Sequence, residues 1–207
     1  VLPSADARGT FDPMCSAHPP PPTRVSLTTG VPFEVDWSAW RPRDRAVLAF
    51  VRSGGRLLLI HKKRGLGAGK VNAPGGRIEA GETALQAAVR ETREEVGVTP
   101  LDLREAGTLA FAFSDGYSLH CTVFAASACR GTPVETDEAA PFWCHETEIP
   151  YGRMWMDDRL WLPLFLAGRR FDAWFVFEDD LALWHQLRAA PGRYGGTSRT
   201  AENTRQA

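Results

Sequence analysis

Three glutamates between residues 91 and 95 have a spacing that places their carboxylates on one face of a helix. Glu91, Glu94 and Glu95 occupy positions i, i+3 and i+4, which are neighbours when a helix turns by about 100° per residue. Like charges at these positions destabilise an isolated helix, but a hard cation such as Mg²⁺ binds oxygen ligands and removes that cost. A bound divalent cation neutralises phosphate charge and activates an attacking water. The pattern therefore predicts metal-assisted chemistry on phosphates.

The sequence around these glutamates predicts the helix that carries them. Gly81-Glu82-Thr83 opens a segment rich in helix formers, and Gly97 stands where a helix C-cap is expected. Arg90 is placed to hold and orient a neighbouring glutamate. The helical period also gathers a second face, which we expect to pack on the core: Leu85, Ala88, Val89, Thr92 and Val96.

The alternative interpretation is an ordinary amphipathic helix whose acidic face is solvated. A loose group of three glutamates would favour that alternative. Here, however, the glutamates are accompanied at fixed spacings by two glycines, a further glutamate and an arginine: Gly76, Gly97, Glu82 and Arg90. We therefore prefer a catalytic site.

With this register, the stretch from Gly76 to Val98 resembles the signature of the Nudix hydrolases, G-x5-E-x7-R-E-U-x-E-E-x-G-U, where U is a bulky apolar residue. Every position matches except the first U, which is Thr92. The resemblance implies the Nudix fold, an α/β/α sandwich with a mixed β-sheet. It also implies Mg²⁺-dependent cleavage of a nucleoside diphosphate linked to another group, with Mn²⁺ as an alternative ion. Glu91, Glu94 and Arg90 would be catalytic.

The composition narrows the class of protein further. The chain has 207 residues, of which 43% are hydrophobic and 24% charged, and its formal net charge is -1; these values predict one domain with a sizeable core. Near-neutral charge gives no basis for binding nucleic acid polymers. No apolar run approaches the roughly 18 residues needed to span a bilayer, and nothing resembles a secretory signal. We expect a cytoplasmic monomer with reduced cysteines, acting on a small-molecule nucleotide.

The ends of the chain differ in composition from its middle. Residues 1–43 contain a polyproline segment and are expected to be a largely disordered extension, although Trp37 and Trp40 are unusual in a linker and are expected to pack on the domain. Residues 44–187 are predicted to form the hydrolase domain. Residues 188–207 are rich in Gly, Thr, Ser and Arg and are predicted to be a disordered tail.

The middle of the chain alternates between strand-like and helix-like patterns. Strands are expected at 46–51 and 56–61, joined by the hairpin signal Ser53-Gly54-Gly55, and a glycine-rich loop follows at 64–76. Further strands are expected near 105–113, 117–126, 142–146 and 171–178, and helices at 158–167 and 180–188. Helices packed on a mixed sheet agree with an α/β sandwich.

Three further motifs narrow the resemblance from the Nudix family to one of its branches. Over roughly 44–187 the chain is similar to the oxidised purine nucleoside triphosphatase (8-oxo-dGTP diphosphatase) branch of the Nudix family. The residues that carry this similarity are 62–72 (KKRGLGAGKVN), 131–138 (GTPVETDE), and 154–158 (MWMDD) with 161–163 (WLP).

The resemblance implies a role for individual residues. The metal and catalytic shell would consist of the Gly75 carbonyl, Glu91, Glu94, Glu95 and, from outside the helix, Glu138. Lys62 would meet a phosphate, and Gly76 would contact the substrate. The remaining substrate-binding residues would read the edge of the base, stack on it or wall the pocket: Asn72, Asp157 and Asp158; Trp155; Phe111 and Trp161.

Several of these residues also have a structural alternative. Trp155 and Trp161 could be core residues, and Lys62 could be an exposed cation at the end of a strand. Asn72 could be a turn residue in its glycine-rich loop, and Asp157-Asp158 could cap the helix that begins there.

The adjacent acids have a physical logic beyond the resemblance. Two neighbouring carboxylates that face an aromatic pocket cannot both ionise cheaply, so one pKa should rise. A protonated aspartic acid donates a hydrogen bond and an ionised one accepts it, so Asp157 and Asp158 could match several purine edges.

Some positions depart from the pattern of the branch, and these leave the shape of the pocket open: Val47, Leu66, Val71, Pro74 and Leu119. An oxidised dATP, a methylated dGTP or an unmodified nucleotide therefore remain alternative substrates. Two other functions also remain open. One is hydrolysis of another nucleoside diphosphate derivative, such as ADP-ribose or a dinucleotide. The other is nucleotide binding by a catalytically silent domain.

Overall fold

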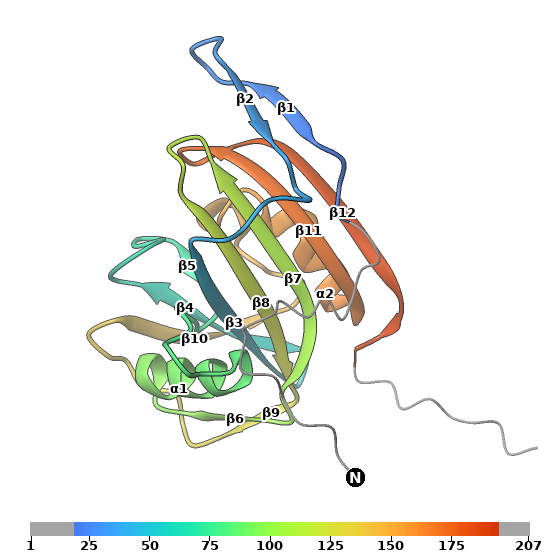
Figure 1. Cartoon of the computed structure of the whole chain (residues 1–207). Helices are drawn as coiled ribbons and strands as arrows, with labels where there is room; N and C mark the ends of the chain where they lie inside the picture. The colour runs from blue at the N-terminus through green and yellow to red at the C-terminus, as the bar shows by residue number, and fades with distance from the viewer. Residues whose placement is uncertain (1–18, 195–207) are drawn as a thin grey trace, which may run out of the picture.

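A computed structural model describes residues 19–194 of the chain, and within them one mixed sheet forms the centre of the molecule (Figure 1). Its strands follow the order β10-β4-β3-β8-β7-β11-β12, with β5 beside β4. The strands are β3 (Asp44–Ser53), β4 (Arg56–Lys62), β5 (Val71–Asn72), β7 (Arg104–Phe113), β8 (Ser118–Ala126), β10 (Ala139–His145), β11 (Arg169–Glu178) and β12 (Leu181–Arg193). The pairs β3–β8 and β7–β11 are parallel, and the other pairs of this sheet are antiparallel.

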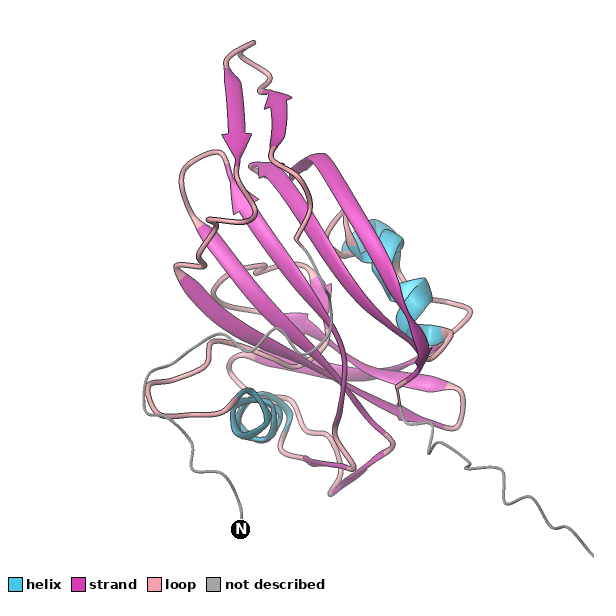
Figure 2. Ribbon diagram, turned by 45° about the vertical axis from the view of Figure 1, so that its right-hand side comes forward, coloured by secondary structure: helices cyan, strands magenta, loops and turns pink. Residues whose placement is uncertain are grey.

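Two α-helices of the described chain cover opposite faces of the sheet, as Figure 2 shows. Helix α1 (Ala84–Val96) packs its small residues on β3 and β8, in a cluster that includes Ala88, Ala49 and Phe124. Helix α2 (Asp158–Leu166) packs on the other face through Trp161 and Phe165, within the largest apolar cluster. The predicted α/β/α sandwich with a mixed sheet is thus confirmed.

Shorter elements complete the described chain. They are the hairpin of β1 (Thr23–Ser26) and β2 (Pro32–Val35), the pair β6 (Thr99–Leu101) and β9 (Ala128–Arg130), and a 3₁₀ turn at Tyr151–Arg153. No helix in this part of the chain is long and apolar enough to cross a membrane.

The predicted hairpin between β3 and β4 is present, and it opens the site. Gly54 and Gly55 have φ values of 56° and 72°, the left-handed conformation that a two-residue hairpin turn favours. Strands β3 and β4 pair with each other over only two residue pairs before they separate. Beyond that point the loop backbone takes the place of β4, because the Val47 N–H donates to the Gly76 carbonyl and the Ala49 N–H to the Pro74 carbonyl.

Local signals set both ends of α1. Thr83 is the N-cap and forms a capping box with Gln86, and Gly97 is the predicted C-cap, with φ at 73°. The predicted core face is wrong in part, since Leu85 is 48% exposed. Ala88, Thr92 and Val96 are buried as predicted, and Ala87 and Glu95 are buried in addition. Small alanines let the helix approach the sheet closely. The helix is therefore turned about its axis relative to the prediction, and Glu95 points inward.

The predicted helix at 180–188 is wrong, because these residues belong to strand β12. The strand pairs antiparallel with β11 from Leu181 onward and so satisfies the outer hydrogen-bonding edge of that strand. It continues to Arg193, so the predicted disordered tail is also wrong for residues 188–193. Residues 195–207 lie outside the described part of the chain.

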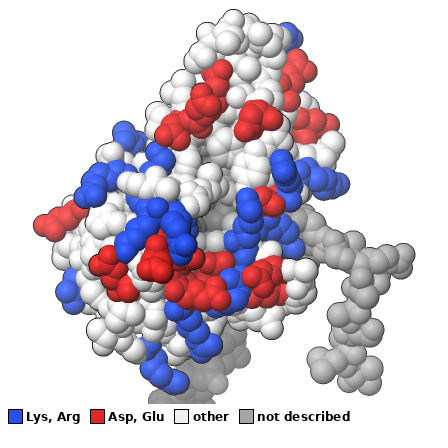
Figure 3. Space-filling view, turned by 90° about the vertical axis from the view of Figure 1, so that its left-hand side faces the viewer, with Lys and Arg blue, Asp and Glu red and all other residues white. Residues whose placement is uncertain are grey.

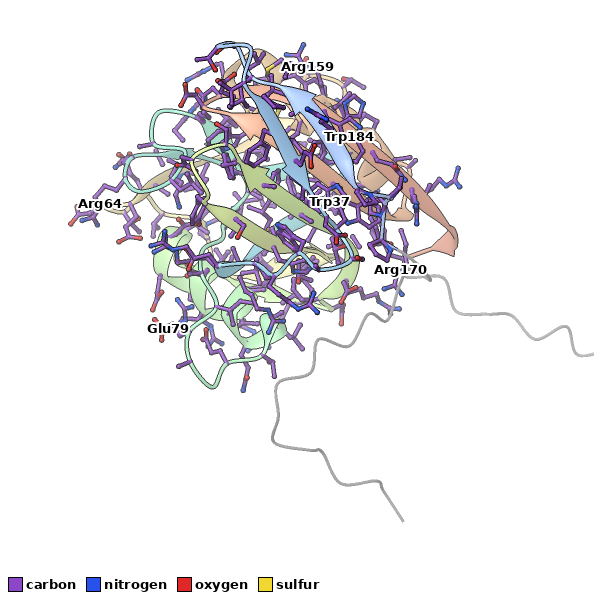
Figure 4. The ribbon with its side chains drawn as sticks, turned by 45° about the horizontal axis from the view of Figure 1, so that its top comes forward. Trp37, Arg64, Glu79, Arg159, Arg170 and Trp184 are labelled. Atoms are coloured by element: carbon purple, nitrogen blue, oxygen red, sulfur yellow. The ribbon has the colours of Figure 1, made fainter. Side chains whose placement is uncertain are left out.

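The prediction that residues 1–43 are largely disordered is wrong for residues 19–43. The β1–β2 hairpin stands at one end of the sheet, and the chain after it packs on the face opposite α2. Trp37 is 4% exposed, stacks on Trp184 of β12 at 5.9 Å, and donates its indole N–H to Thr23 (Figure 4). The expected packing of Trp37 and Trp40 is therefore confirmed. Residues 1–18 are outside the described range.

Candidate active site

A pocket of about 420 Å³ lies where β3 and β4 separate. Strands β3, β7, β8 and β11 form its apolar wall: Leu48, Leu109, Phe111, Phe113, Leu119 and Phe177. The pocket also contains most of the predicted site residues outside α1: Lys62, Asn72, Gly75, Gly76, Glu138, Trp155, Asp157 and Asp158. A volume of this size suits a small organic ligand.

Trp161 does not belong to the pocket wall, so this part of the prediction is wrong. Its side chain is fully buried and packs against Phe50 and Phe171. Its indole N–H donates to Asp157 Oδ2 over 3.0 Å. Trp161 thus lies behind the pocket and orients one of its acids. Trp155, by contrast, lines the pocket, and the core alternative applies to Trp161 alone.

The adjacent acids are both buried at the pocket wall, each 3% exposed. Asp158 accepts a hydrogen bond from the backbone N–H of Trp155, and Asp157 makes no capping hydrogen bond to α2. Burial raises the pKa of Asp157 to about 6. Burial is the main cause that raises the pKa of Asp158 well above its usual value, and the neighbouring charge of Asp157 adds to the rise. The two acids therefore favour sharing a proton over ionising together.

Asn72 ends the short strand β5 and lines the same pocket. Its side-chain oxygen accepts a hydrogen bond from the N–H of Ala73 over 2.8 Å, which fixes the direction of its amide group. Strand pairing of Asn72 with Ile60 places it in β5, so the turn alternative does not describe it.

The glycine turn at the start of the acidic motif has no room for side chains. A Cβ atom on Gly75 would lie 2.1 Å from the Val47 carbonyl oxygen, and one on Gly76 would lie 2.4 Å from the carboxylate of Glu91. The turn thus brings bare backbone between β3 and the acidic helix. The carbonyl of Gly75 can consequently act as an oxygen ligand beside the glutamates.

Glu95 is the most deeply buried of the three glutamates, with 1% exposure. It accepts hydrogen bonds from the Lys62 ammonium at 2.7 Å and from the Gly75 N–H at 2.8 Å. Burial raises the pKa of Glu95, and Lys62 opposes that rise. Lys62 is thus no exposed strand-end cation, since its side chain is only 17% exposed and holds a buried carboxylate.

Arg90 makes the contact with neighbouring glutamates that was expected of it. Its guanidinium donates to Glu91 and Glu94 at 2.9 Å each, and it holds Glu82 through two bonds of 2.7 and 2.9 Å. A further bond at 3.0 Å reaches the carbonyl of Arg77. Arg90 thereby anchors the loop before α1 to the acidic face of the helix.

The predicted metal ligands form an all-oxygen set of the kind that hard divalent cations prefer. Each of the four carboxylates is ion-paired here: Glu91 and Glu94 with Arg90, Glu95 with Lys62, and Glu138 with Arg64. Among the described residues, no three such side chains lie close enough together to hold a metal ion as they stand. Figure 3 views the side where α1 lies in Figure 1 and shows acidic residues in its lower half with Lys and Arg beside them.

The chemistry of this donor set nevertheless fits a divalent metal. Burial is the main cause that raises the pKa of Glu91. Arg90 opposes this rise, and the charges of Glu95 and Glu94 add to it. Carboxylates that are buried and crowded in this way gain from additional positive charge. The donor atoms and their electrostatics agree, so the residues fit a divalent cation.

Sequence reasoning missed several residues of the pocket. Phe113 lines it two residues after Phe111, and the period of two along a strand could have identified it. Arg77 and Tyr117 also line the pocket, and both bind Asp44, at 3.1 and 3.0 Å. No pattern in the sequence marks this group, which strand pairing assembles.

A mixed sheet between two helices, with a carboxylate-rich helix beside a glycine turn and a pocket lined by aromatic residues, is typical of a hydrolase of phosphate-containing small molecules. The chain belongs to the Nudix family, because the family model of the NUDIX domain matches residues 42–165. Members of this family generally use a divalent metal ion and act on small nucleotide substrates.

Individual relatives agree with this assignment. The chain is 42% identical over 142 residues to an oxidized purine nucleoside triphosphate hydrolase of Danio rerio, covering 68% of this chain and 91% of the relative. It is 38% identical over 143 residues to the protein of the same name from Mus musculus, covering 68% and 92%. The crystal structure of a mutator MutT protein from Bacillus halodurans superposes with a TM-score of 0.64 at 26% identity, covering 70% and 97%.

Proposed function

We propose that this protein hydrolyses an oxidised or otherwise modified purine nucleoside triphosphate to the monophosphate and pyrophosphate. The observation that carries the proposal is the pair Asp157 and Asp158, buried with raised pKa values at the wall of an aromatic pocket. The names of the Danio rerio and Mus musculus relatives support the same substrate class.

At the base end of the pocket, the acid pair would read the purine edge. One protonated and one ionised carboxyl group supply a donor and an acceptor, a combination that matches purines whose oxidation has changed their hydrogen-bonding pattern. Asn72 would add an amide, and Trp155 and Phe111 would contact the faces of the base. Apolar walls exclude water and strengthen these hydrogen bonds.

At the phosphate end, Mg²⁺, or Mn²⁺ in its place, would be held by the Gly75 carbonyl, Glu91, Glu94, Glu95 and Glu138. Such an ion neutralises charge on the phosphates and lowers the pKa of bound water. Lys62 would contact a phosphate oxygen, and Gly76 would let the phosphate chain approach the backbone.

The chain's own acid–base groups would complete the reaction. Glu94 is 58% exposed and so is open to the attacking water, and Glu91 lies beside it. These two glutamates are our candidates for accepting the proton of the water. Arg90 would keep both carboxylates in position.

The biological role that we propose is sanitation of the cytoplasmic nucleotide pool by a monomer that acts on free nucleotides. Hydrolysis to the monophosphate keeps a damaged purine out of newly made nucleic acid. The near-neutral net charge of -1 supports free nucleotides over a nucleic acid polymer.

The test is pyrophosphate release by the purified full-length protein with Mg²⁺. The substrates are 8-oxo-dGTP, 2-hydroxy-dATP, O6-methyl-dGTP, dGTP and ADP-ribose, and the controls are excess EDTA and Glu94→Gln. We expect strong preference for a modified purine triphosphate, lost in both controls. Turnover of ADP-ribose alone would retain the hydrolase and reject the purine pocket. Binding without any turnover would favour the catalytically silent alternative.

A further inference from the structure

Lys70 contacts Trp155 from outside the pocket. Its ammonium lies over the indole ring, 4.7 Å from the ring centroid. Trp155 lines the pocket, whereas Lys70 does not. The cation thus lies over one face of a ring that also lines the pocket.

The loop that carries Lys70 is closed at its base and fits closely around the same ring. The Lys62 N–H donates to the Lys70 carbonyl, and the Gly69 N–H donates to the Lys62 carbonyl, which ties the loop to the end of β4. Gly67 has φ at 82°, and a Cβ atom there would lie 3.1 Å from the indole nitrogen of Trp155. Lys70 is thus presented to Trp155 by a constrained backbone.

The turn between β11 and β12 holds Lys70 from the other side. Asp180 in this turn accepts from the Lys70 ammonium over 2.9 Å. Phe177, three residues earlier, lines the pocket and makes a T-shaped contact with Trp155, with ring centroids 6.4 Å apart and an interplanar angle of 86°. Trp155 is therefore contacted by a cation over one face and by the ring of Phe177 in a T-shaped arrangement.

We propose that Lys70, held by Asp180, is a positioning residue that sets the plane of Trp155 for stacking on the base of the substrate. The proposal rests on the function proposed above. Stacking depends on the offset and angle of two rings, and a cation over one face of an indole holds the ring and favours contact with its other face. The bond that is cleaved lies among the phosphates, so Lys70 should affect binding of the base and leave the chemical step unchanged.

The experiment compares Lys70→Met with Lys63→Met in the full-length protein. Lys63→Met is a matched control, because it removes the same charge from the neighbouring segment, where Lys63 pairs with Glu135 away from Trp155. For the preferred modified purine triphosphate we expect Lys70→Met to raise KM by about 3-fold to 10-fold, with kcat changed by less than about twofold. Lys70→Arg should restore KM, since arginine also binds aromatic faces.

Two further measurements separate positioning of the ring from general electrostatics. The inhibition constant of tripolyphosphate, which has no base, should be the same in wild type and Lys70→Met. Asp180→Asn should raise KM less than Lys70→Met does, because Asp180 is 70% exposed and exposed ion pairs contribute little.

The proposal is overturned if Lys70→Met leaves KM unchanged, if Lys63→Met raises KM equally, or if tripolyphosphate binding weakens in parallel. A wild type without turnover would instead reject the proposed function. Calorimetric binding of 8-oxo-dGMP would then decide the role of Lys70, with weaker binding by Lys70→Met expected and equal binding contradicting it.

Discussion

The Lys62 ammonium lies 2.7 Å from the carboxylate of Glu95, whose side chain is only 1% exposed. The same carboxylate accepts the N–H of Gly75. Strand β4, the glycine turn and helix α1 are thus joined through one buried charge. A buried carboxylate of this kind is tolerated only while its basic partner and its hydrogen bonds remain in place.

Lys62→Met should therefore destabilise the protein when divalent metal is absent. Removing one partner of a buried ion pair leaves the other charge uncompensated, and we expect the free energy of unfolding to fall by about 3 kcal/mol. Urea unfolding in EDTA measures this loss. Lys63→Met, which removes an exposed partner of Glu135, should cost less than about 1 kcal/mol. Mg²⁺ should recover part of the loss in Lys62→Met, and equal losses in the two variants would contradict the structural role of the pair.

Arg90→Lys should lower kcat. The guanidinium of Arg90 reaches Glu82, Glu91 and Glu94 at once, which a single ammonium cannot do. Misplaced carboxylates should reduce kcat by about 10-fold to 100-fold. Steady-state kinetics measure the effect, and Arg93→Lys is the control because Arg93 bonds Thr99 away from the pocket. A loss of similar size in the control would reject the assignment.

Asp157→Asn should change how stability depends on pH. Burial raises the pKa of Asp157 to about 6 in the folded protein, above its value in the unfolded chain. The folded state then binds the proton more strongly, so this contribution to stability is fully present below about pH 4 and is lost as the pH rises through 6. We expect the variant to remove a fall on the order of 2 kcal/mol between pH 4 and pH 8.

Denaturant unfolding of wild type and Asp157→Asn across this pH range checks the prediction. Glu91, Glu95 and Asp172 also have raised pKa values and remain in both proteins, so the difference between the two curves is the informative quantity. The charge of Asp157 raises the pKa of Asp158, so that pKa should fall in the variant and the difference reports the pair of acids. Parallel curves would contradict a raised pKa at Asp157.

Trp37→Ala should destabilise the whole domain if the segment before β3 is part of it. Trp37 stacks on Trp184 and bonds Thr23, and replacing a buried tryptophan by alanine costs about 3–5 kcal/mol. Thermal unfolding measures the loss. Val31→Ala, in the same segment but 55% exposed, should cost less than about 0.5 kcal/mol. A small loss in Trp37→Ala would make the segment a dispensable extension.

Features that depend on neighbours in the chain could be predicted from the sequence. The acidic helix and its C-cap at Gly97 were predictable because caps and helical period are local properties. The hairpin at Gly54 and Gly55 was predictable because few residues other than glycine adopt its backbone conformation. The acidic motif and the family resemblance likewise identified the residues that now lie in or beside the pocket.

Features that depend on distant partners required the tertiary structure. Residues 181–193 form a strand because β11 offers an open hydrogen-bonding edge, and Trp37 is buried because Trp184 of that strand lies beneath it. Trp161 carries the same apolar signal as Trp155, and only packing places one behind the pocket and the other in its wall. The sequence thus determined which residues could carry the chemistry, whereas contacts between distant segments decided which side chains face one another, because burial and pairing are properties of the assembled fold.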